Sequence, residues 1–167
     1  MDRFNIIYPF VRIENRIFIY IEFMNLIIGS SPDLASMGFK ANRLVYERNV
    51  EKSEIDSAYY VPIVRARYRG YIVRVAEYKR DTNEIVIVFG YEDGEAAGIK
   101  PQYDPFDKMN GYYEACVPES EVEEIFEVRE PEKSFPFESP RIAFHKKDGV
   151  WLKWHDLGAP LQDDEWI

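Results

Sequence analysis

The fold of this chain is decided by residues 59–92, which read YYVPIVRARYRGYIVRVAEYKRDTNEIVIVFGYE. Three runs rich in β-branched and aromatic residues are separated by two short polar turns. In chain order, the runs and turns are 59–68, Arg69-Gly70, 71–80, Asp81-Thr82-Asn83 and 84–91. Runs of this kind, joined by turn-forming residues, are typical of antiparallel strands that are neighbours in a sheet. The stretch therefore predicts a three-stranded meander, which occurs in small SH3-like barrels and in open α+β sheets alike.

The flanking sequence continues this pattern and predicts an α+β fold of mainly antiparallel sheet, with an N-terminal hairpin, a C-terminal hairpin and one to three short helices. Ser31-Pro32-Asp33 has the residues of a helix start and Gly38 those of a helix end. The segment 120–129 is left open, because Ser120 and Glu123 have capping-box spacing while the residues after them also suit a strand. The other predicted strands are 4–13, 17–28, 39–50, 112–117, 141–145 and 150–154.

A chain of 167 residues is long enough to bury a substantial core, so a single domain over 1–167 is expected. The segment 130–140 contains three prolines and is the place where a weak domain boundary would fall. No internal repeat is visible in the sequence.

The composition indicates the cellular compartment in which the protein is expected. Cys116 is the only cysteine, which excludes an intrachain disulfide and a multi-cysteine zinc site. The first residues lack the features of a secretory signal, and no apolar run reaches the roughly 18 residues of a membrane helix. A soluble protein of the reducing cytoplasm, without a membrane partner, is therefore expected.

The charges are distributed unevenly along the chain. The net charge is −9, with +4 in residues 1–80 and −13 in residues 81–167. An acidic protein repels the nucleic-acid backbone, so a nucleic-acid partner is not expected. The asymmetry predicts a molecule with two differently charged faces.

Motifs for catalysis are missing from the sequence. There is no G-x-S-x-G, no phosphate-binding loop and no dinucleotide fingerprint, so a non-enzymatic protein without cofactor is favoured. Cys116 lies in a predicted strand and is expected to be buried and inert. His145 and His155 lack the spacing of a zinc pair, and the carboxylates near residues 92–107 lack that of a calcium loop, so no metal site is predicted.

Arg65, Arg67 and Arg69 occupy alternate positions and are predicted to project from one strand face, with Arg74 across the turn. This basic stripe suits phosphate or an acidic partner. The alternative, favoured on general grounds, is a solvated face that pairs with the protein's own acids.

The acidic C-terminal half carries the predicted partner surface, because carboxylates beside aromatic anchors suit recognition of a basic protein. An acidic surface that only maintains solubility is the alternative. The candidate contact residues are Glu123, Glu124, Glu127, Asp163, Asp164, Glu165 and Trp166.

In size, acidity and lack of catalytic signatures the chain resembles the small bacterial immunity proteins. That resemblance implies an inhibitor that blocks a basic toxin or nuclease, and it assigns no site residues. A second hypothesis is an enzyme or small-ligand protein in which loop 93–111 covers a pocket over the meander. A third is a homo-oligomer formed by pairing of exposed strand edges.

Overall fold

The computed structural model describes residues 9–61, 63–102, 112–138 and 140–152, and these form two compact units. Of the described residues, unit 1 contains 63–102, 112–128 and 142–152, and unit 2 contains 9–61, 129–138, 140 and 141. Each unit has one antiparallel sheet of seven strands, which confirms the mainly antiparallel β fold predicted from the sequence. Whether the two units fold as the single domain expected from the sequence stays a prediction.

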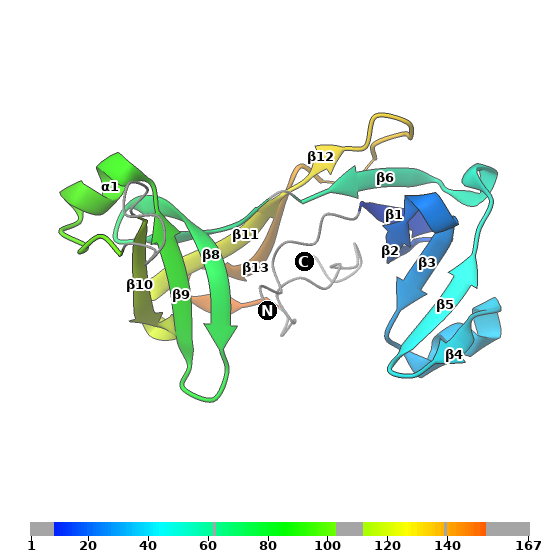
Figure 1. The fold of residues 1–167 in the computed structure, drawn as a ribbon, viewed down its shortest axis with the longest axis horizontal. Coiled ribbons are helices and arrows are strands. Elements are labelled where there is room, and N and C mark those ends of the chain that lie inside the picture. The colour runs from blue at the N-terminus through cyan, green and yellow to red at the C-terminus, as the bar shows by residue number, and fades with distance from the viewer. Residues whose placement is uncertain (1–8, 62, 103–111, 139, 153–167) are drawn as a thin grey trace. The chain divides into compact units, whose positions relative to one another are not determined.

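Unit 2 has the strand order β12-β6-β1-β2-β3-β5-β4 (Figure 1). Its strands are β1 (Phe10–Ile13), β2 (Arg16–Ile21), β3 (Leu26–Gly29), β4 (Lys40–Asn42), β5 (Val45–Asn49), β6 (Ser57–Tyr60) and β12 (Glu130–Pro131). Its 3-10 helices are η1 (Glu22–Met24), η2 (Pro32–Met37) and η3 (Lys52–Glu54).

The N-terminal hairpin is confirmed, since β1 and β2 pair across a turn at Glu14 and Asn15, both with positive φ. The helix expected after Ser31 is also present as η2 and ends at Gly38, whose φ is +82°. Two predicted strands were too long. The run 17–28 is divided by η1 and the left-handed Asn25, and the run 39–50 is a hairpin that turns at Arg43.

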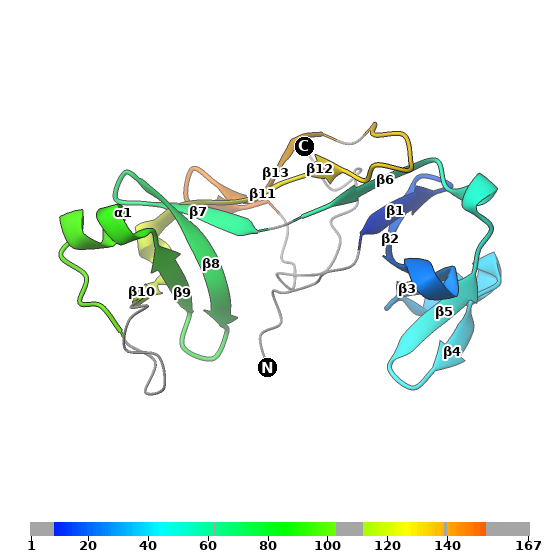
Figure 2. The same cartoon turned by 45° about the horizontal axis from the view of Figure 1, so that its top comes forward.

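Unit 1 has the strand order β10-β9-β8-β7-β11-β13-β14 (Figure 2). Its strands are β7 (Val64–Tyr68), β8 (Tyr71–Lys79), β9 (Glu84–Phe89), β10 (Tyr113–Pro118), β11 (Val122–Val128), β13 (Ile142–Lys147) and β14 (Val150–Trp151). Its helices are α1 (Tyr91–Ala96) and the 3-10 helix η4 (Glu119–Glu121).

The predicted meander is β7-β8-β9, turning at Arg69-Gly70 and at residues 81–83. The predicted first strand of the meander, 59–68, started too early, because residues 59 and 60 belong to β6 in the sheet of unit 2. The ambiguous segment 120–129 forms one 3-10 turn and then the strand β11. The C-terminal hairpin β13-β14 turns at Asp148 and Gly149, both with positive φ as the Asp-Gly pair predicts.

The two units share one connectivity, although no repeat is visible in the sequence. In each unit, four strands follow one another as neighbours, a 3-10 helix comes next, and a fifth strand returns to pair with the first. The five strands are β1, β2, β3, β5 and β6 in unit 2, with η3 before β6, and β7, β8, β9, β10 and β11 in unit 1, with η4 before β11. The short strand β4 lies in the connection between the third and fourth strands of unit 2.

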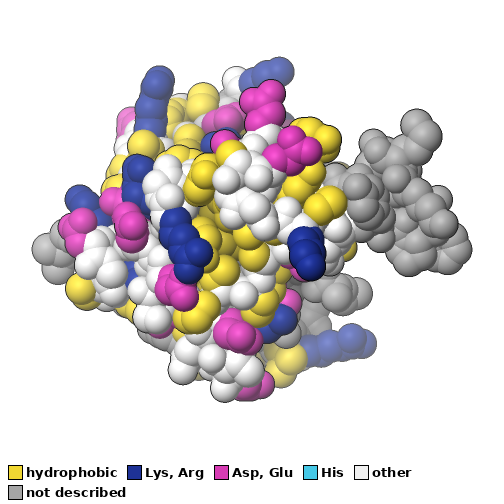
Figure 3. Space-filling view, turned by 90° about the vertical axis from the view of Figure 1, so that its left-hand side faces the viewer, with side chains coloured by type: hydrophobic (Ala, Val, Ile, Leu, Met, Phe, Trp, Pro, Cys, Tyr) yellow, Lys and Arg dark blue, Asp and Glu magenta, His cyan; other side chains and the backbone are white. Residues whose placement is uncertain are grey.

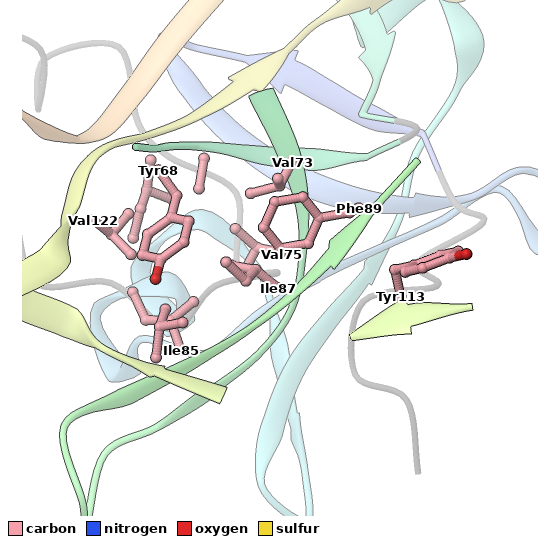
Figure 4. Close-up of a cluster of buried hydrophobic side chains, with 11 residues drawn as sticks. Tyr68, Val73, Val75, Ile85, Ile87, Phe89, Tyr113 and Val122 are labelled. Carbon is pink, nitrogen blue, oxygen red and sulfur yellow. The ribbon is translucent and has the colours of Figure 1, made fainter. Parts of the chain in front are cut away.

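The core of unit 1 shows that its sheet is curled. Side chains from all five of these strands meet in one buried cluster, which includes Tyr68, Val75, Ile87 and Val122 (Figure 4). One face of a sheet can enclose such a core by itself only if the sheet bends around it. Unit 2 has its own cluster, which includes Val11, Phe18 and Ile27.

The charge is distributed differently between the two units than between the two halves of the sequence. Among the described residues, unit 1 has nine basic and 13 acidic side chains, and unit 2 has nine and 10. The basic strand β7, from the first half of the sequence, lies beside the acidic strand β11 from the second half. Among the described residues, 9 − 13 gives −4 for unit 1 and 9 − 10 gives −1 for unit 2, a much smaller difference than that between the two halves of the sequence.

Candidate functional site

A short acidic helix with an exposed aromatic residue stands out in unit 1. The helix α1 starts directly after β9, with Gly90 as its N-cap residue. Glu92 and Asp93 lie in its first turn, where a carboxylate interacts favourably with the unpaired N–H groups of a helix start. The "α1 surface" is defined here as Tyr91, Glu92, Asp93 and Glu95.

Gly94 fixes this helix on the strand β10. Gly94 is buried, and a Cβ added to it would overlap the side chain of Tyr113 on β10. Only a residue without a side chain lets the backbone of α1 come this close to an aromatic ring. The α1 surface is therefore held on a strand whose ring belongs to the core of unit 1.

Tyr91 and Glu95 are four residues apart, lie on the same face of α1, and both contact Tyr113. The rings of Tyr91 and Tyr113 are 5.4 Å apart in an edge-to-face arrangement. The Tyr113 hydroxyl donates a hydrogen bond of 3.4 Å to Glu95 Oε1. Burial, together with the nearby negative charge of Glu95, raises the pKa of Tyr113 to about 12.

The outer part of this surface is free to meet a partner. Tyr91 is 65% exposed, and Glu92, Asp93 and Glu95 are all exposed. None of these three carboxylates forms an ion pair with any residue that the structure describes. Figure 3 shows the side of unit 1 where α1 lies in Figure 1, and acidic and hydrophobic side chains are neighbours on it.

The glutamates predicted from the sequence, Glu123, Glu124 and Glu127, lie elsewhere, on β11, and their surroundings differ from the expectation. Glu124 Oε2 is 3.0 Å from Arg67 Nε. Glu127 is buried, with its Oε2 atom 3.3 Å from His145 Nε2. Glu123 is exposed. A buried Glu127 and a paired Glu124 leave Glu123 as the accessible member of the three. Asp163, Asp164, Glu165 and Trp166 lie outside the described residues.

Arg65 and Arg67 of the basic stripe alternate on β7, and Arg69 lies in the turn that follows this strand. Arg65 and Arg69 are exposed, Arg67 is half-buried, and Ala66 and Tyr68 between them face the core. Arg67 and Arg69 pair with the chain's own acids, since Arg69 Nη2 is 2.7 Å from Glu121 Oε2. Arg74 lies directly opposite Arg65.

A buried charged cluster was not anticipated from the sequence. Lys146, 1% exposed, donates from Nζ to Glu119 Oε1 at 2.5 Å and to the Glu119 carbonyl at 2.7 Å. The indole N–H of Trp151 donates to the same carboxylate oxygen at 2.9 Å. A β-bulge on β11–β13 turns Lys146 inward, where its strand partner is the core residue Ile125. Strand alternation alone could not reveal this, because a bulge shifts the register of side chains.

Cys116 corrects another expectation, because its side chain is exposed. It lies in a strand as predicted, yet it points to the outer face of β10, 3.6 Å from Lys79 Nζ. Among the described residues, no group of three or more His, Cys, Asp or Glu side chains is placed to hold a metal ion.

The loop 93–111 is described only in part. Its first residues complete α1, and Gln102 and Tyr112 form a bridge that brings the two ends of the following segment together. Residues 103–111 lie outside the described residues, as does His155.

No known protein family, curated protein or solved structure matches this chain. None of the helices in the described ranges has the length and apolar character needed to cross a membrane.

Proposed function

We propose that this chain is a non-enzymatic protein-binding module that recognises a partner with a basic surface through the α1 surface. The observation that carries this proposal is the exposed ring of Tyr91 beside three carboxylates that have no internal ion pair in the described part of the chain. Binding of a basic protein is the function that the acidic composition predicts. The α1 surface, however, is not the surface that was predicted to carry it.

The chemistry of this surface supports recognition of a protein. Tyrosine is enriched among residues that dominate binding energy, because it offers a large apolar area with a polar tip. Carboxylates around such an anchor attract a positively charged partner and increase the association rate. Gly94 and Tyr113 hold the helix in place before binding, which reduces the entropy lost in the complex.

The finer form of the proposal is an immunity-type inhibitor in the cytoplasm, with a basic toxin or nuclease as its partner. The motivation is the acidity of the chain, with a net charge of −9, together with its small size. We also infer that each unit is a small SH3-like barrel, because its fifth strand returns to the first after a 3-10 turn. Folds of this class host many functions, so the barrel by itself does not select one.

The test compares two variants with the same change in charge. Glu92→Lys/Asp93→Lys/Glu95→Lys reverses the α1 surface. Glu77→Lys/Asp81→Lys/Asp148→Lys reverses three other exposed acids of unit 1. Both proteins and the unchanged chain are immobilised, and native host lysate is passed over them at low and at high salt.

We expect a basic protein to be retained by the unchanged chain and by the control variant, to be released by salt, and to be lost from the α1 variant. Circular dichroism of the three proteins checks that they are equally folded. Equal retention by all three would remove the α1 surface from the proposal, and retention of nothing by the unchanged chain would count against the binding function itself.

A further inference from the structure

The two units carry matching rows of side chains across the outer faces of their sheets. Each row begins with an aromatic residue on the fifth strand, crosses the first, second and third strands, and ends with a glutamate on the fourth. In unit 2 the row is Tyr59, Phe10, Ile19, Ile28 and Glu47. In unit 1 it is Phe126, Arg65, Arg74, Val88 and Glu114. The second and third positions of the row are therefore apolar in unit 2 and arginine in unit 1.

In unit 2, another segment of the same chain packs against one end of this row. Phe10 and Tyr59 are buried in a cluster against which Phe137 packs. Phe137 belongs to a segment without helix or strand, and this segment is tied to the sheet where the N–H of Ala58 donates to the Pro136 carbonyl at 2.9 Å. Unit 2 thus shows an aromatic side chain of an irregular segment packed on the aromatic end of its row.

In unit 1, the corresponding positions expose two positive charges. Arg65 and Arg74 are direct cross-strand partners and both are exposed. Like charges directly opposite each other destabilise a sheet. No acidic side chain in the described ranges pairs with either guanidinium, whereas Arg67 on the same strand and Arg69 in the turn after it are both paired.

Apolar groups lie at both sides of this arginine pair. Phe126, next in the row, is buried, and its ring lies tilted at 5.8 Å from the ring of the half-buried Phe144 of β13. Ile72, which lies opposite Arg67, is 39% exposed. A guanidinium binds carboxylates in a bidentate manner, and an apolar neighbour favours a ligand that also has an apolar side chain.

We propose that this outer face of unit 1 binds an extended acidic segment of a partner protein. Its carboxylates would lie on Arg65 and Arg74, and an apolar side chain would lie against the half-buried Phe144 beside Phe126. Glu114 at the end of the row and the net charge of −9 disfavour a long polyanion such as a nucleic acid. This surface shares no residue with the α1 surface, so the two proposals stand or fall separately.

The probe is a fluorescein-labelled seven-residue peptide with glutamate at alternate positions and one phenylalanine. A matched peptide has glutamine in place of each glutamate. The test variant is Arg65→Gln/Arg74→Gln, and the control variant is Arg67→Gln/Arg69→Gln, which removes the same charge from β7 and the turn after it. Binding is measured by fluorescence anisotropy at several salt concentrations.

The glutamate peptide should bind in a salt-dependent manner, and the Kd should rise by about tenfold or more in the test variant, since two charge-assisted contacts are lost. The control variant should change the Kd much less. Because the test variant removes a repulsion between like charges, its stability to urea should be equal to or above that of the unchanged chain, so lost binding could not be ascribed to unfolding.

Three results would overturn the proposal. The first is that the glutamate peptide does not bind. The second is that the glutamine peptide binds as tightly as the glutamate peptide. The third is that the control variant loses as much affinity as the test variant. If a single-stranded DNA oligonucleotide or inorganic phosphate bound at these arginines in preference to the peptide, the face would be a phosphate site and the protein-segment assignment would be wrong.

Discussion

Gly94 is the residue on which the position of the α1 surface depends most directly. It lies in the middle of a six-residue helix, where glycine is intrinsically unfavourable by about 1 kcal/mol relative to alanine. The close approach of the Tyr113 ring explains why the unfavourable residue is present. Gly94 lowers the helix propensity of α1 and at the same time allows close contact between the helix and the sheet.

Replacement Gly94→Ala should therefore destabilise unit 1, by about 1–3 kcal/mol for an overpacked site, in spite of the better helix propensity. The measurement is urea denaturation followed by circular dichroism. Gly90→Ala is the matched control, because a Cβ at Gly90 meets nothing within 4 Å. Equal stability of the Gly94→Ala protein and the unchanged protein would show that Tyr113 can move away without cost.

The hydroxyl of Tyr113 makes stability depend on pH. Its pKa is about 12 in the folded chain and 10.0 in its ordinary state, so the folded chain holds this proton more tightly than the unfolded chain does. The contribution to stability is complete below pH 10 and is lost as the pH rises from about 10 to about 12. We expect the free energy of unfolding to fall over this range.

The variant Tyr113→Phe keeps the ring and removes the proton. Its free energy of unfolding should decline less steeply between pH 10 and pH 12. Some decline should remain, because burial also raises the pKa of Tyr20, Tyr68 and Tyr78. An unchanged slope, measured by denaturation at a series of pH values, would contradict the assignment.

At the scale of elements, sequence patterns predicted the hairpins correctly where the turn contains residues that accept a positive φ. The turns at Asn15, at Arg69-Gly70 and at Asp148-Gly149 all contain residues that accept positive φ, and all three hairpins are present. The end of η2 at Gly38 follows the same rule. Local backbone chemistry decides these positions, so a single sequence is enough to find them.

Patterns failed where distant contacts decide the structure. The run 59–68 was predicted as one strand, yet its beginning and end pair with different sheets. Pro62 between the two parts is a local sign of a break that the prediction did not use, but it does not tell which sheet each part joins. Ser120 and Glu123 fit a helix start, but pairing of β11 with both β7 and β13 makes this segment a strand. Tertiary contacts here override a weak local preference.

The sequence predicted which kinds of residue form the candidate site, but it did not predict where on the molecule they lie. Acidity next to aromatic residues is visible in the sequence, and so is the alternation of the arginines. The pairing of β7 with β11 was not visible, and it is this pairing that uses Arg67 and Glu124 to neutralise each other. The helix α1 was missed because fewer than two turns with a central glycine give almost no periodic signal.

At the scale of the whole molecule, each core belongs to one unit, and this gives a test of the expected single domain. Ile27 in unit 2 and Ile85 in unit 1 are both fully buried, so an alanine at either position should cost about 2–5 kcal/mol. We expect Ile27→Ala to accelerate amide hydrogen exchange in the strands of unit 2 and to leave those of unit 1 largely protected, as for separate cooperative units.

Ile85→Ala is the matched variant and should show the reverse pattern, with both effects measured by mass spectrometry. Faster exchange throughout the chain in either variant would instead show that the units open together, as one domain.

The order of the strands has a further consequence for the chain while it is being made. β6 ends at Tyr60, and its partner β12 starts at Glu130, whose carboxylate accepts a hydrogen bond from the Tyr60 hydroxyl 70 residues earlier in the chain. At about 5–20 residues per second, a ribosome needs roughly 4–14 seconds to synthesise the residues between them. During that time β6 has no β12 beside it, and an uncovered strand edge is a template for pairing with another chain. The speed of translation therefore sets how long each newly made molecule exposes this edge to its neighbours on the same messenger RNA.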